Sequence, residues 1–95
     1  MSLRVTVPAG GAAMDRDRPF PVLMTEANRA MVALDDITMR DGSKATAATV
    51  RDGLRVYSEL LNYRETVRMN MADISLLQTA LDMLRSRLRF FGQVV

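Results

Sequence analysis

The most regular feature of the chain is the spacing of apolar residues in its last quarter. They recur at alternating intervals of three and four residues, at Ile74, Leu77, Leu81, Leu84, Leu88 and Phe91. The opposite stripe is polar and runs from Ser75 through Asp82 to Arg89. Because an α-helix has about 3.6 residues per turn, this spacing places the apolar set on one face. The pattern therefore predicts an amphipathic helix, whose apolar side is widened further by Leu76, Ala80, Met83 and Phe90.

Residues 45–67 show the same kind of spacing in two stripes. One stripe contains Val50, Leu54, Tyr57 and Leu61, and the other contains Val56, Leu60, Tyr63 and Val67. The whole region 45–91 has no proline and one glycine, Gly53, so nothing in its composition interrupts a helix strongly.

The pattern of residues 45–91 is compatible with two architectures. In the first, one continuous helix about 70 Å long, at 1.5 Å per residue, forms a coiled coil with Asn70 in its seam. In the second, the chain turns at Arg68–Met71 and forms an antiparallel hairpin, in which Asn70 caps the last helix and Asp73 lies in its first turn. We favour the hairpin because its helices have ordinary lengths, although no glycine or proline marks the turn.

A shorter helix precedes this region. It is predicted by one apolar face, which consists of Met24, Ala27, Met31 and Leu34. Thr25 is the expected N-cap, and the helix should end near Met39, before the turn residues Asp41-Gly42-Ser43. Residues 1–23 hold all three prolines and predict an irregular arm. The predicted fold is therefore all-α: an arm over 1–23 and a single helical domain over 24–95, made of a helical hairpin and the shorter N-terminal helix.

The apolar faces of the hairpin are wider than two helices can bury against each other. We expect a two-fold homodimer that completes a helical bundle, with a monomeric three-helix bundle as the rival arrangement. The predicted interface consists of Val56, Leu60, Ile74, Leu77, Leu81, Leu84, Leu88 and Phe91.

Composition limits the chemistry. With 95 residues, 48% hydrophobic and 25% charged, the chain has the make-up of one ordinary globular domain. It contains no cysteine and no histidine, which excludes disulfides, thiolate metal sites, a cysteine nucleophile and a histidine base. The acidic cluster of Asp35, Asp36 and Asp41 does not match a calcium-binding loop. The only lysine, Lys44, follows Ser43, whose better role is a helix cap. We expect no enzyme activity, metal or cofactor.

Arginine is the remaining candidate for binding chemistry. Arg85, Arg87 and Arg89 stand near the chain end without an acidic neighbour, where cations favour a helix terminus. They could instead contact phosphates, so the alternative function is a small nucleic-acid-binding regulator. The net charge of only +2 and the lack of interleaved aromatics argue against that alternative.

The favoured function is a non-catalytic, self-associating helical interaction or structural module, such as an adaptor, scaffold or chaperone-like protein, open to a protein partner. The sequence shows neither a signal peptide nor a transmembrane stretch, which predicts a cytoplasmic location.

Overall fold

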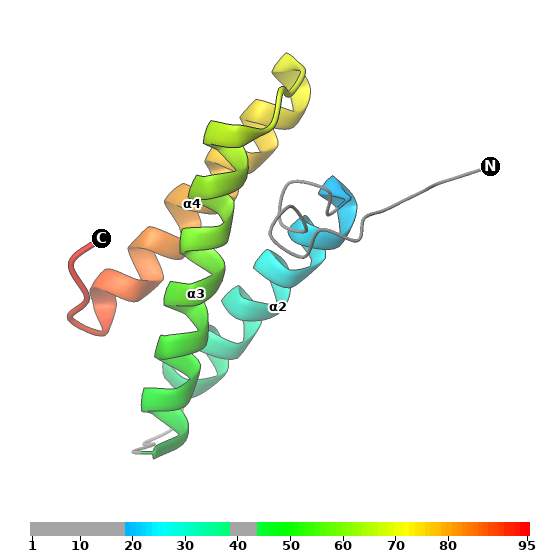
Figure 1. Cartoon of the computed structure of the whole chain (residues 1–95). Coiled ribbons are helices and arrows are strands. Elements are labelled where there is room, and N and C mark those ends of the chain that lie inside the picture. Colours follow the sequence, from blue (N-terminus) through cyan, green and yellow to red (C-terminus); the bar gives the residue numbers. More distant parts are fainter. Residues whose placement is uncertain (1–18, 39–43) are drawn as a thin grey trace, which may run out of the picture.

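A computed structural model describes residues 19–38 and 44–95 of the chain. They form three helices, α2 (Phe20–Thr38), α3 (Lys44–Thr66) and α4 (Met71–Phe90), and the described residues contain no strand. Successive helices run in opposite directions, and all three pack against one another (Figure 1). The predicted all-α fold, a helical hairpin with a shorter helix before it, is confirmed. Of the arm predicted over residues 1–23, residues 1–18 lie outside the described residues.

The hairpin turn falls where the sequence places it, so the continuous helix is wrong. Asn70 has the extended backbone of an N-cap, with φ −78° and ψ 168°. Its side-chain oxygen accepts the backbone N–H of Asp73 at 2.8 Å, and its amide nitrogen donates to the Asp73 carboxylate at 3.3 Å. The cap satisfies one of the N–H groups that a helix start leaves without an intrahelical partner. Val67 and Met69 pack against the core on either side of Arg68 and hold the turn in place.

Helix α2 begins earlier than predicted. It starts at Phe20, and the carbonyl of Pro19 accepts the first backbone bonds, from Val22 at 3.1 Å and Leu23 at 3.2 Å. Pro21 lies in the first turn, where a missing N–H removes no helical hydrogen bond. The prediction that Thr25 caps this helix, and that the arm extends to residue 23, is therefore wrong. The Thr25 hydroxyl instead donates to the carbonyl of Pro21 at 2.9 Å, within the helix.

One hydrophobic core lies between the three helices. Its fully buried large side chains come from all of them: Leu23, Leu34, Val56, Leu60, Leu77, Leu81, Leu84 and Leu88. No polar or charged residue is buried among the described residues. Helix α2 therefore covers the apolar faces that the hairpin alone would leave in water.

Gly53 of α3 lies against both α2 and α4. A Cβ atom at this position would stand 3.2 Å from a methyl carbon of Leu34 on α2 and 3.2 Å from one of Leu88 on α4. The absence of a side chain on α3 lets both leucines approach its backbone. A glycine in mid-helix costs about 1 kcal/mol of stability relative to alanine, and the close packing of the two leucines offsets this cost.

Candidate interaction surface

The structure places most of the predicted interface inside a single chain. Six of its residues are at most 1% exposed, and all belong to the three-helix core: Val56, Leu60, Leu77, Leu81, Leu84 and Leu88. Ile74 is 38% exposed, and Phe91 is partly buried against the core. The chain's own helices thus provide the packing that we expected from a second copy. A partner that binds this folded chain meets a different set of side chains.

The main exposed apolar side chains on α4 form a second line along that helix. Leu76, Met83 and Phe90 are 55%, 41% and 72% exposed. They stand seven residues apart, which is nearly two helical turns, so they lie along one line on the helix. We call these three residues the α4 stripe. The sequence shows them only as a widening of the apolar face, because spacing does not reveal which part of a wide face the rest of the chain covers.

Beside the α4 stripe, a shallow groove separates α4 from α2. Its volume is about 230 Å³, and it is lined by Leu76, Thr79, Ala80 and Met83 from α4 and by Met24, Asn28 and Met31 from α2. Three of these side chains are methionines, which are flexible and polarizable and adapt to differently shaped apolar partners. Leu76 and Met83 belong both to the groove and to the α4 stripe, so the two features adjoin on the α2–α4 side of the bundle.

The outer border of the α4 stripe carries no charge. On the outer side of α4, the residues three or four positions from the stripe are Ala72, Thr79 and Ser86, none of which is charged. Arg87, four residues after Met83 on α4, donates two hydrogen bonds to Asp35 of α2, at 2.8 and 3.1 Å. It also donates to the carbonyl of Met83 at 3.1 Å. Arg87 and Asp35 therefore form an ion pair across α2 and α4, beside the α4 stripe.

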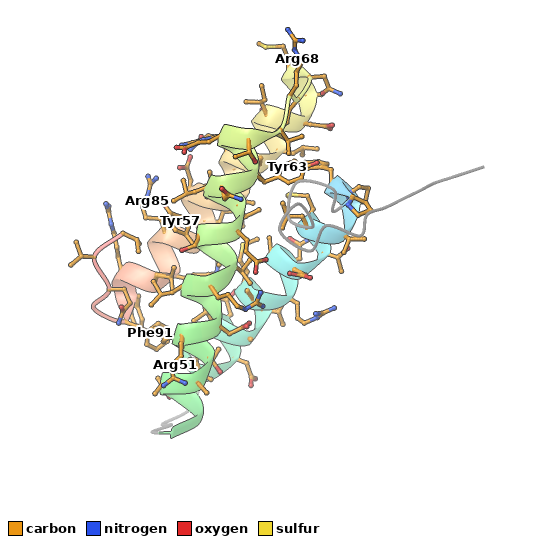
Figure 2. All side chains as sticks on the ribbon, viewed as in Figure 1. Arg51, Tyr57, Tyr63, Arg68, Arg85 and Phe91 are labelled. Atoms are coloured by element: carbon orange, nitrogen blue, oxygen red, sulfur yellow. The ribbon has the colours of Figure 1, made fainter. Side chains whose placement is uncertain are left out.

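The α3–α4 side of the bundle is different, because a line of polar contacts closes it. Arg64 donates to the side chain of Gln78 at 2.7 Å, and Gln78 donates in turn to Asp82 at 3.0 Å. Asp82 lies 3.6 Å from Arg85, which donates to the Tyr57 hydroxyl at 3.0 Å (Figure 2). These contacts join the two helices of the hairpin from the turn to its middle. They also use polar groups that would otherwise be available to a ligand.

Charge on the outer face of α3 is likewise paired. Arg55 donates to Asp52 at 2.8 Å and to Glu59 at 2.7 Å, one turn on either side of it. The hydrogen bond to Asp52 is the main reason that the pKa of Arg55 is raised, and the bond to Glu59 adds to it. Such pairs support the helix modestly, by a few tenths of a kcal/mol each in exposed positions. Nothing about them indicates a binding site.

The three C-terminal arginines do not form a common patch. Arg85 lies against Tyr57 of α3, with its guanidinium 5.9 Å from the ring centre. Arg87 turns the other way, to α2, while Arg89 donates to the main-chain oxygen of Val95 at 2.8 and 3.1 Å. Each guanidinium is engaged within the chain and by a different element. The structure therefore does not assemble the phosphate-binding cluster that the sequence offered as an alternative.

Other classes of site find no support in the part of the chain that the structure describes. Across residues 19–38 and 44–95, no three acidic side chains come together as metal ligands would. In the same residues, no helix has the length and apolar character to cross a membrane. Asp41 of the acidic cluster lies outside the described residues, and Asp35 serves the ion pair with Arg87. Comparison of the chain with protein families, curated proteins and solved structures found no match.

Proposed function

We propose that this chain is a non-catalytic helical interaction module that self-associates through the α4 stripe. The observation that carries the proposal is the exposure of Leu76, Met83 and Phe90 beside the apolar α2–α4 groove. Contiguous apolar surface on an otherwise well-packed bundle is typical of a protein–protein contact. In such a dimer these residues would be buried, and the core leucines would remain as they are.

The order of residues along the stripe suits a two-fold contact. Met83 stands midway between Leu76 and Phe90. If two α4 helices pack antiparallel across a two-fold axis, Met83 meets the partner's Met83, and Leu76 meets the partner's Phe90. The seven-residue spacing keeps the three side chains on one side of α4, where the partner helix would lie.

Charge supports a second copy as the occupant. A surface that carries a net charge repels its own copy, whereas the stripe and its outer neighbours Ala72, Thr79 and Ser86 have none. Arg87 keeps its two hydrogen bonds to Asp35 at the edge of the contact, so no unpaired charge loses water there.

As a small homodimer of this kind, the protein would act as an adaptor, scaffold or chaperone-like module in the cytoplasm. Met24, a partly buried groove methionine that does not belong to the stripe, would supply an adaptable apolar contact for a protein partner at the edge of the dimer. The proposal assigns no reaction and no cofactor to the chain.

Sedimentation velocity over a range of protein concentrations tests self-association. We expect the wild-type chain to approach twice its mass of 10.6 kDa as concentration rises. Met83→Glu should remain a monomer, because it places two carboxylates opposite each other on the two-fold axis. Val94→Glu is the matched control, since Val94 is an apolar residue that is 98% exposed and lies off the stripe.

Equal masses for wild type and Met83→Glu at every concentration would contradict the proposed contact. Circular dichroism of the same samples separates loss of contact from loss of fold. Met83 is already 41% exposed, so the glutamate variant should keep the helical signal of the wild-type chain.

A further inference from the structure

A separate pocket lies at the end of the bundle opposite the α3–α4 turn. It has a volume of about 410 Å³ and opens between the first half of α3 and the segment that follows α4. Val50 and Leu54 of α3 and Phe91 from the end of α4 form its apolar walls. Arg51 also lines it, and lies at the same end of the molecule as Phe91 (Figure 2). The pocket shares no lining residue with the α2–α4 groove.

The end of α4 builds one wall of this pocket. Gly92 has a positive φ of 85°, which reverses the chain directly after the helix. The N–H of Gly92 donates to the carbonyl of Arg89 at 2.9 Å, and that of Gln93 to the carbonyl of Leu88 at 3.1 Å. This pair of bonds is the Schellman motif of helix ends. It fixes Phe91 and Gln93 beside α3, so the wall is a defined part of the fold.

The electrostatics of the pocket favour an anion. Arg51 makes no hydrogen bond or ion pair with another described residue, in contrast to Arg55, Arg85 and Arg87. Among the described residues that line the pocket, none is acidic. A free guanidinium beside apolar walls offers planar donors that match a carboxylate, together with apolar surface for the rest of a ligand.

We infer that this pocket binds a small amphipathic carboxylate, of which a medium-chain fatty acid is the simplest example. The carboxylate pairs with Arg51 at the mouth, and the hydrocarbon chain lies against Val50, Leu54 and Phe91. The volume is at the lower end of the range for small-molecule sites, about 300–1,000 Å³, which suits a short apolar body. Arg51 is the one cation among the described residues that line the pocket. One cation beside apolar walls disfavours a free phosphate, which needs several donors and no apolar surface.

The test is an NMR titration of the isotopically labelled full chain with octanoate, below the concentration at which it forms micelles. We expect saturable shifts at Leu54, Phe91 and Gln93, and little change on α2. Octanol supplies the same apolar chain without charge, and acetate supplies the carboxylate without the chain. Each should bind at least about tenfold more weakly than octanoate, since a charged hydrogen bond and the apolar contact each contribute on that scale.

Two variants assign the site. Arg51→Gln keeps an exposed polar side chain and should weaken octanoate about tenfold, while octanol binding stays unchanged. Ala47→Trp fills the pocket from an exposed position on its edge, and should abolish binding of both ligands without lowering the thermal unfolding midpoint. The inference is overturned if octanoate causes no saturable shifts at the pocket. It is equally overturned if octanol binds as tightly as octanoate, or if Arg51→Gln binds octanoate like the wild type.

Discussion

Asn70 provides the sharpest test of the hairpin, because its replacement has opposite effects in the two architectures that the sequence allows. In the structure, its side-chain oxygen accepts the Asp73 N–H at 2.8 Å at the start of α4. Asn70→Ala removes that acceptor. In a continuous helix, the same change would replace a polar residue of the seam by the best helix former, and the protein would become more stable.

The magnitude follows from the cap and its exposure. Loss of an N-cap side chain costs about 0.5–2 kcal/mol, and about 1 kcal/mol is typical. Asn70 is exposed, so water can take over part of the lost hydrogen bond and the cost stays near that typical value. The second bond, from the Asn70 amide to the Asp73 carboxylate at 3.3 Å, lies in solvent and adds little. For a domain of this size, 1 kcal/mol corresponds to a fall in Tm of about 4–8 °C.

Urea unfolding followed by circular dichroism measures this difference directly. Wild type, Asn70→Ala and Asn70→Asp are compared at one protein concentration, because self-association would itself shift the midpoint. Asn70→Asp is the control, since aspartate caps a helix about as well as asparagine. A wild-type or raised free energy of unfolding in Asn70→Ala would refute the cap and, with it, the account of the turn.

Three further predictions concern stability. Leu81→Ala should lower the free energy of unfolding in urea by about 2–5 kcal/mol, because Leu81 is fully buried. The control Met71→Ala, at an 84% exposed position, should change it by less than about 0.5 kcal/mol. Gly92→Ala should cost about 1 kcal/mol in urea unfolding, since nothing crowds the added methyl group and the cost arises from the φ of 85° alone; Gly92→Asn should cost less. Asp35→Asn should cost less than about 1 kcal/mol, and the difference should shrink in high salt, because its ion pair with Arg87 is partly exposed and screened.

The features that sequence reasoning located correctly are those set by neighbours along the chain. The hairpin turn was predictable because Asn70 and Asp73 stand three residues apart, the spacing at which a cap and its helix start interact. The start of α2 was missed because Pro19 and Pro21 were interpreted as helix breakers. A proline in the first turn interrupts no hydrogen bond, and the sequence alone does not show which turn is first.

The surface could not be obtained in the same way. Periodicity shows that Leu77, Leu81 and Leu84 face apolar neighbours, but it does not distinguish a second copy from α2 of the same chain. The α4 stripe becomes visible only after α2 has covered the rest of the face. Gly53 was also missed as a packing position, because its contacts with α2 and α4 join residues far apart in sequence.

The pocket beside Arg51 depends on similar long-range contacts. Its walls come from α3 and from the segment after α4, about 40 positions apart in the chain, a separation that no local pattern bridges. One signal was present in the sequence, namely a glycine directly after the last periodic residue, Phe91. That placement is typical of a helix C-terminus and predicts the chain reversal, although not what the reversed segment packs against.

Self-association through the α4 stripe is the central claim, and a single cysteine tests it most directly. The chain has no cysteine of its own, so Met83→Cys introduces a unique thiol at the proposed two-fold axis. There it would face its own copy at a distance that a disulfide can span. Under mild oxidation, we predict rapid conversion of Met83→Cys to a species of twice the 10.6 kDa chain mass, while Asn62→Cys, exposed on α3, stays a monomer. Slow cross-linking at equal rates in both variants would contradict the account.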